Sequence, residues 1–463
     1  MKKWLLLLLS VVIISFGLVA CSDDSSSTDN NTDSENTQDD TDTNETEGEN
    51  ATNGDEAAEE PEDVTLSFFS TNPDRETGMG GVEQQIIDSY MEENPHVTIE
   101  VEALQDEPYK DKIKIYSSTD SLPDILMTWG QSSFISPLIN NGLLHELDPA
   151  DYGDYGFIEG SFDGFSSDGK LYGLPKNTDF LPLFYNKRLF EENGLEVPTT
   201  EEELIAVSKE LRELDINPVV TNAMEGWILP MWFDYALQRE TGSFDLMDEA
   251  LAGDASYTDP AVIAAAEKMK RMADEGVFAD GWLTADYGTA RNLFGQEQAA
   301  MYLMGAWEMG LATDENFPES FRENVAVTNY PVSDNAEAGD LVIYQGGGFS
   351  IAENSEHKEE AEAFLKYFYS PDNWPKLVWE SGAAMPAQDF ELTGEESDLQ
   401  KQMVDLFNSV TSASGTPVLD DSTPEFKETI MSLHQQLFTG DVTAEEFGEQ
   451  LDEAAAKARE ASE

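Results

Sequence analysis

Histidine and cysteine are scarce in this chain of 463 residues, which has four histidines and one cysteine. None of the four histidines stands at metal-ligand spacing from another, so we expect no transition-metal site. No G-x-S-x-G, phosphate-binding loop or dinucleotide motif is present. Acidic residues are so dense that carboxylate pairs arise by chance, and none stands out as a glycosidase pair or a calcium site. We therefore expect no catalytic residue and no cofactor, and the sequence singles out no metal site.

Tryptophans near the ends of predicted strands are better candidates for ligand binding. The run 123–129 predicts a strand with Trp129 just past its end, and a buried strand over 299–304 leads to Trp307. Trp227 follows a glycine at the edge of a loop. An indole offers a flat apolar surface to a ligand, but each of these rings could instead pack in a core.

The elements that must position these residues begin with a β-α-β unit. Residues 64–69 and 97–101 alternate as strands, and a helix is predicted over 82–93 between them. In such sheets ligands sit beyond the carboxyl ends of the strands. Phe69, Ser70 and Thr71 are therefore candidate cleft residues, with an ordinary loop as the alternative.

The stretch 168–204 links turns, strands and short helices. A polar turn at 168–170 precedes an extended passage in which Pro182 interrupts a strand over 180–185. A short helix over 186–192 follows, and Thr199 with Glu202 predicts a capping box at the start of the next helix. Further helices are predicted over 261–275, 399–409, 424–437 and 444–458.

Several stretches form a pattern with a consistent order along the chain: Pro123-Asp-Ile with its apolar run, Asp168-Gly-x-x-Tyr-Gly-Leu-Pro, Tyr185-Asn-Lys-x-x-Phe-Glu-x-x-Gly-Leu with the following Val-Pro-Thr-Thr, Phe294 to Glu308, Gly346 to Leu365, and Ser381 to Ala387. In this pattern the chain resembles the extracellular solute-binding proteins of sugar-importing ABC transporters, in particular the maltose- and oligosaccharide-binding lipoproteins. The resemblance extends over essentially all of residues 64–463.

The resemblance implies an α/β fold of two lobes, a periplasmic-binding-protein fold of the class II type. Each lobe would hold a doubly wound sheet, and several strands would form the hinge. The expected boundaries are 64–177 with 326–370 for lobe 1, and 180–323 with 373–463 for lobe 2. Residues 176–180 would make the first crossing, and hinge motion would relate open and closed forms.

The resemblance also implies a binding site in the cleft between the lobes. Trp129 from one lobe and Trp307 from the other would sandwich sugar rings, whose apolar faces pack well on indoles. Asp179, Trp227, Glu308 and the backbone at Gly347 would complete the site. The alternatives are hinge stabilisation for Asp179, surface charge for Glu308, and close approach of a neighbouring strand for the glycine.

The first 63 residues read as export and tethering signals. Residues 1–20 have a positive start and an apolar run typical of a signal peptide. Leu18-Val19-Ala20-Cys21 resembles the lipobox of bacterial lipoproteins, in which the cysteine thiol receives a lipid such as a palmitate-containing group. A retained membrane helix is the alternative. Residues 21–63 would then form a lipidated cysteine and a disordered acidic tether, so an extracytoplasmic body would be anchored to the cell membrane.

Charge limits the partners. The formal net charge of −69 argues against nucleic-acid binding, which requires basic patches. It suits a solvated acidic surface in a saline, halophilic or alkaline exterior; collection of cations or basic peptides is an alternative.

The resulting expectation is a monomeric, non-catalytic carbohydrate receptor that passes a mono- or oligosaccharide to ABC permease subunits. A receptor for a peptide or another nutrient, or less plausibly a surface enzyme acting on polysaccharide, remains as an alternative.

Overall fold

The computed structural model describes residues 62–332 and 339–462. The predicted signal segment, Cys21 and nearly all of the predicted tether lie outside the described residues. Within them, no helix has both the length and the apolar character that a membrane span requires. The described residues form one compact unit, and they contain two main sheets, each with its own hydrophobic core.

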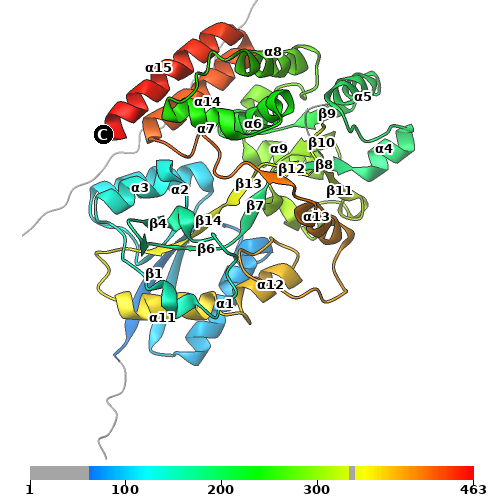
Figure 1. The fold of residues 1–463 in the computed structure, drawn as a ribbon. Helices are drawn as coiled ribbons and strands as arrows, with labels where there is room; N and C mark the ends of the chain where they lie inside the picture. Colours follow the sequence, from blue (N-terminus) through cyan, green and yellow to red (C-terminus); the bar gives the residue numbers. More distant parts are fainter. Residues whose placement is uncertain (1–61, 333–338, 463) are drawn as a thin grey trace, which may run out of the picture. The chain divides into compact units, whose positions relative to one another are not determined.

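The first sheet has the strand order β2-β1-β3-β14-β6. Its strands are β1 (Val64–Ser70), β2 (Val97–Ala103), β3 (Ile125–Trp129), β6 (Leu174–Pro175) and β14 (Gly347–Ile351). Figure 1 labels its strands β1, β6 and β14. β1 runs parallel to β2 and β3, as the predicted β-α-β unit requires, and β14 is antiparallel to β3. Its helices are α1 (Gly78–Glu93), α2 (Asp106–Ser118), α3 (Ser132–Asn140), α11 (Lys358–Phe368) and α12 (Trp374–Glu380). α11 packs on β1 and β14 and also contacts α1.

The second sheet has the order β11-β8-β10-β9. Its strands are β8 (Leu183–Asn186), β9 (Asn217–Val220), β10 (Ala299–Leu303) and β11 (Val325–Thr328). β10 is parallel to β9 and antiparallel to β8. The helices that follow in the chain are α4 (Lys187–Asn193), α5 (Glu201–Glu213), α6 (Ile228–Thr241), α7 (Asp245–Ala252), α8 (Pro260–Asp274), α9 (Tyr287–Gly295), α10 (Glu319–Arg322), α13 (Asp398–Asn408), α14 (Pro424–Thr439) and α15 (Ala444–Ser462).

Three passages of chain join the two sheets. β7 (Thr178–Phe180) leads from β6 to β8, and it pairs antiparallel with β13 (Ile343–Gln345), which leads into β14. A third passage runs beside β7, because the Thr178 amide donates to the Met385 carbonyl at 3.2 Å and the Ala387 amide donates to the Lys176 carbonyl at 2.9 Å. Nearby, β12 (Asp340–Leu341) pairs with β15 (Ser412–Ala413).

Two segments do not pack with the lobe to which the boundaries expected from the sequence assign them. β11 begins at Val325 and pairs with β8, so residues 326–328 belong to the second sheet. Trp374, Val378 and Ala383 lie in the core of the first sheet, because α12 packs on α1. Hydrophobic periodicity identifies a helix and its apolar face, but it does not say which of two cores receives that face.

The helix after residue 199 begins one residue later than predicted. Thr200 is the N-cap of α5 and forms the capping box with Glu203, whereas the sequence prediction paired Thr199 with Glu202. Glu203 also accepts from the Thr199 amide and hydroxyl at 2.8 Å. Two adjacent threonines before a run of three glutamates make the register ambiguous in sequence. Pro182 separates β7 from β8, where a single interrupted strand was expected.

Candidate functional site

Trp307, one of the two predicted stacking residues, and Trp227, another predicted site residue, meet at one edge of the second sheet. Because β9 and β10 are parallel, the loops after them leave from the same edge, which is where ligands bind in open α/β sheets. The loop after β10 carries Trp307, and the loop after β9 ends at Trp227, the N-cap residue of α6. The centroids of these two rings are 6.0 Å apart with their planes inclined at 51°. Both rings are partly exposed, so they form an aromatic surface at the rim of the core.

Glu308 lies beside this pair but is already bound within the protein. Its side chain is almost fully buried. Tyr287 donates its hydroxyl to Oε1 at 2.5 Å, and Arg291 donates its Nε to Oε2 at 2.9 Å. Arg291 also pairs with Asp314 at 2.8 Å. Glu308 therefore ties α9 to the segment that carries Trp307, and its predicted contact with a ligand remains a prediction.

Several buried polar groups near the same edge lack a hydrogen-bond partner in the structure. They are the indole nitrogen of Trp227, the Thr221 hydroxyl, the side-chain oxygen of Asn222 and the Tyr302 hydroxyl. Buried polar groups are normally paired, and unpaired ones in a native fold require an explanation such as an absent partner. An ordered water or a ligand hydroxyl that reaches these groups would satisfy them.

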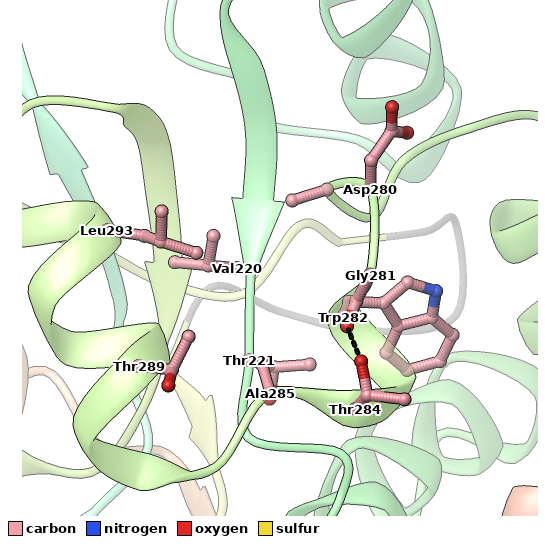
Figure 2. Close-up of a pocket in the computed structure, with 10 residues that line it drawn as sticks. Val220, Thr221, Asp280, Gly281, Trp282, Thr284, Ala285, Thr289 and Leu293 are labelled. Carbon is pink, nitrogen blue, oxygen red and sulfur yellow. Dashed lines mark hydrogen bonds between the residues drawn. The ribbon is translucent and has the colours of Figure 1, made fainter. Parts of the chain in front are cut away.

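A small pocket opens beside the end of β9 (Figure 2). Thr221 and Thr289 face it, and Trp282 and Leu293 contribute apolar surface. The Thr284 hydroxyl is satisfied within the loop, since it donates to the Gly281 carbonyl at 2.9 Å. The unpartnered Thr221 hydroxyl is the polar group in this pocket that a small ligand or an ordered water would satisfy. Sequence reasoning did not single out this pocket, because its residues come from three separate segments.

Trp129 lies at the corresponding edge of the first sheet, at the end of β3. Its ring is partly exposed and packs edge-on against Tyr109 and Phe134, with centroid distances of 5.7 and 4.8 Å. The ammonium group of Lys110 lies 5.0 Å from the ring centroid. Trp129 is thus anchored by aromatic neighbours while part of its surface stays accessible.

The loop that follows β1 is fixed by a buried ion network around Glu83. This carboxylate is fully buried, and it accepts from Ser70 Oγ at 2.7 Å and Asn72 Nδ2 at 2.8 Å. It also pairs with Lys176 Nζ at 2.7 Å and with Arg75 Nη1 at 2.5 Å. Burial alone would raise the pKa of Glu83, but the two cations more than offset burial and the net pKa is lowered. The network ties Ser70, one of the candidate cleft residues, and the nearby Asn72 to the first crossing at Lys176.

Glu83 was not singled out from the sequence. It stands in α1 among several other acidic and amide residues, and nothing in its spacing distinguishes it. The one signal in the sequence was its position on the helix face that Val82 and Ile86 also occupy, which is buried. Charged residues on an apolar helix face are rare unless they are paired.

Asp179 lies in the crossing strand β7 and is 7% exposed. Burial raises its pKa to about 7, although Lys176 acts in the opposite direction. Its Oδ1 has no hydrogen-bond partner, and a Cβ built at Gly346 would come within 1.7 Å of its Oδ2. Gly346 therefore leaves the space that the Asp179 carboxylate occupies.

Gly347 faces Trp129 in the register between β14 and β3. A Cβ at this position would lie 1.9 Å from the terminal methyl of Met127, so a side chain here would require the flexible end of Met127 to move. The Gly347 carbonyl accepts from the Lys176 amide at 2.9 Å. These contacts agree with close approach of a neighbouring strand, the alternative that the sequence left open.

The two sheet edges influence each other electrostatically. Burial raises the pKa of Glu225, which lies in the loop before Trp227, and Asp106 and Glu107 at the start of α2 add to the rise. Burial likewise raises the pKa of Tyr344 in β13, and Asp179 and Asp106 contribute. No group of three or more acidic, histidine or cysteine side chains suited to a metal occurs among residues 62–332 and 339–462.

Comparisons with known proteins identify the family and the fold. The sequence profile of the bacterial extracellular solute-binding proteins matches residues 74–373. The "Multiple sugar-binding protein" of Streptococcus mutans is 24% identical over 343 residues, which are 70% of this chain and 77% of that protein.

Two solved structures share the fold. One, from work on xylan utilization by the thermophilic bacterium Caldanaerobius polysaccharolyticus, aligns with a TM-score of 0.77 at 26% identity and covers 84% of this chain and 99% of that one. A chitin oligosaccharide binding protein aligns with a TM-score of 0.76 at 21% identity, covering 86% of this chain and 99% of that one. The expected two-lobed α/β fold is thereby confirmed.

Proposed function

Because the chain belongs to the family of bacterial extracellular solute-binding proteins, we propose that it is a receptor that captures an oligosaccharide and delivers it to an ABC importer. The observation that supports this most directly is the Trp227–Trp307 pair, which stands among buried polar groups that lack partners. Indole faces match the apolar faces of sugar rings, and the unpaired donors and acceptors match their hydroxyls.

The binding site that we propose adds Trp129, Asp179 and the backbone at Gly347 from the first sheet and the crossing strands. Trp129 provides a second aromatic surface that is already braced by its neighbours. Asp179 provides an unsatisfied carboxylate oxygen beside the chain crossings. A sugar that contacts groups from both sheets would favour the closed arrangement, because only differential contacts shift a conformational equilibrium.

A sugar panel tests the proposal. The purified protein is titrated with xylo-oligosaccharides, chito-oligosaccharides, raffinose and malto-oligosaccharides while tryptophan fluorescence and melting temperature are followed. A saturating sugar at about 100 times its Kd would stabilise the fold by about 2.7 kcal/mol. If no neutral sugar changes the fluorescence or the melting temperature but a peptide does, the protein is a peptide receptor and not a sugar receptor. Release of shorter products on incubation would show an enzyme.

We propose further that the protein is monomeric and held at the membrane by lipid on Cys21, which extends the extracellular location of the family. The support is the sequence Leu18-Val19-Ala20-Cys21 after an apolar run. Cys21→Ser should move the protein from the membrane fraction to the medium in a host that processes lipoproteins. Retention of the variant in the membrane fraction would favour an uncleaved helix.

A further inference from the structure

A second pocket, which we call the acidic pocket, is lined by residues of α6, α7 and the segment 414–418, and neither Trp227 nor Trp307 lines it. Its polar lining residues are Asp234 from α6, Asp248 from α7, and Ser414 and Thr416 from the segment 414–418. Phe244, Met247 and Val418 are among its apolar lining residues.

Asp234 is unusual among the buried acids of this protein because nothing compensates its charge. Its side chain is 6% exposed, and within the described part of the chain it forms no hydrogen bond or ion pair. By contrast, Glu83 pairs with Lys176, and Glu201 pairs with Lys268 at 2.7 Å. An unpaired buried carboxylate is costly, so it is either protonated or neutralised by a cation.

The surroundings of the acidic pocket add further negative charge. Burial raises the pKa of Asp234 well above its usual value, and Asp248 and Asp420 contribute to the rise. Partial burial also raises the pKa of Asp248 to about 6, and Asp421 and Asp245 add to the rise, although Asp248 as a whole residue is exposed to solvent. Lys427 is close by, but it is bound to Asp420. Among the residues that the structure describes, none of the groups that shift these two aspartates is a cation.

We propose that the acidic pocket binds a hard divalent cation of the calcium class through the carboxylates of Asp234 and Asp248 and the Thr416 hydroxyl, with water completing the coordination. Calcium accepts mixed oxygen ligands in irregular geometry, which suits ligands from three separate segments. Two carboxylates make a weak site, with a Kd in the range of about 0.1 to 1 mM that is common for extracellular modules. Sequence reasoning could not separate this pair from the many acidic residues around it.

The site would hold a segment that connects the two cores. Residues 414–418 continue to Asp420, whose carbonyl accepts from the Ser133 amide at 2.9 Å. Ser133 belongs to α3, which packs with the first sheet, whereas Val418 belongs to the core of the second. A cation in the acidic pocket would therefore stabilise a contact between the elements of the two sheets.

Calcium alone is the probe for the test. The purified protein is stripped with a chelator and dialysed, and its melting temperature is measured with CaCl₂ at about ten times the upper Kd, against MgCl₂ and NaCl at matched ionic strength. We expect a rise of about 2 to 4 °C that is specific to calcium. Calorimetric titration should give one binding event per chain.

Two variants make the result specific. Asp234→Asn should abolish the calcium response and should melt at or above the temperature of the chelated parent, because it removes an uncompensated buried charge. Asp248→Asn, at the solvent side of the pocket, should lower calcium affinity by tenfold or more without unfolding the protein. Asp254→Asn, an exposed residue beyond α7, is the control and should keep the full response.

An unchanged calcium response in both Asp234→Asn and Asp248→Asn would overturn the site. So would the absence of any calcium-specific effect on the parent, in which case Asp234 is simply a neutral buried acid.

Discussion

The ring of Trp307 packs directly over Gly305, so closely that a Cβ at residue 305 would come within 1.9 Å of the ring. The backbone itself therefore fixes one face of this tryptophan, and Trp227 braces it from the side. A partly exposed aromatic ring that is held in this way loses little freedom when a ligand packs on it. This arrangement distinguishes Trp307 from the tryptophans that serve the core.

Truncation of Trp307 should weaken binding without unfolding the protein. We expect Trp307→Ala to lower oligosaccharide affinity by about thirtyfold, the loss typical of a binding hot spot, with a cost in stability of about 1 kcal/mol. Trp232→Ala is the matched control, because Trp232 is 1% exposed and its removal should cost about 3 to 5 kcal/mol. Calorimetric titration and chemical denaturation measure the two effects. Similar destabilisation by both variants would assign Trp307 to the core.

Loss of Lys176 should be strongly destabilising. Lys176→Met preserves most of the side-chain volume beside Phe349 and Trp374 but leaves the buried Glu83 carboxylate with Arg75 as its remaining cation. Breaking a buried ion pair from one side costs about 3 to 5 kcal/mol. Urea denaturation at neutral pH measures the loss.

Lys170→Met provides the control for Lys176→Met. Lys170 pairs with Glu146 at the surface at 2.6 Å, and solvent already screens this pair. We expect almost no change in stability. A small effect of Lys176→Met would mean that water enters the Glu83 network and hydrates the carboxylate.

The helices and strands of this fold can be predicted from the sequence more readily than the elements against which they pack. The βαβ unit, the helices after residue 398 and the strand before Trp307 all have clear periodicity or capping residues, and they form within a few residues of the prediction. No comparable pattern in the sequence indicates which of the two cores β11 and α12 join. Long-range pairing depends on the whole chain, whereas a helix or a strand depends on its own few residues.

The same difference applies to the candidate site. Trp307 stands out because it follows small residues at a strand end. Glu83 and Asp234 do not stand out, because nothing in the sequence distinguishes them from the other acidic residues among the 94 in the chain. Their importance appears only when burial and the presence or absence of a cationic partner are known.

Replacement of Asp179 should change how stability depends on pH. The folded pKa of about 7 lies above the usual value of 3.8, so the folded protein binds this proton more tightly than the unfolded chain does. Asp179 therefore favours folding below about pH 4, and this contribution is lost as the pH rises through 7, by up to about 4 kcal/mol. Asp179→Asn should be more stable than the parent at pH 8 and nearly equal to it at pH 4.

Asp124→Asn should show the opposite sign. Burial opposes ionisation of Asp124, but hydroxyls of Ser355 and Ser67 donate to its carboxylate and the net pKa is lowered. Its stabilising contribution is present above the unfolded pKa and is lost as the pH falls, so the variant should be less stable than the parent at pH 8. Denaturation at several pH values tests both variants. Parallel pH profiles for the parent and Asp179→Asn would show that Asp179 is hydrated.

A single methyl group at residue 305 should impair binding while leaving the core intact. In Gly305→Ala the new Cβ must displace the Trp307 ring, which is able to move because it is partly exposed. We expect oligosaccharide affinity to fall by tenfold or more, with a change in tryptophan fluorescence and a melting temperature within a few degrees of the parent. Gly153→Ala is the control, because a Cβ there meets nothing closer than the Ala150 carbonyl oxygen at 3.5 Å. Unchanged affinity in Gly305→Ala would show that the orientation of the Trp307 ring does not determine sugar binding.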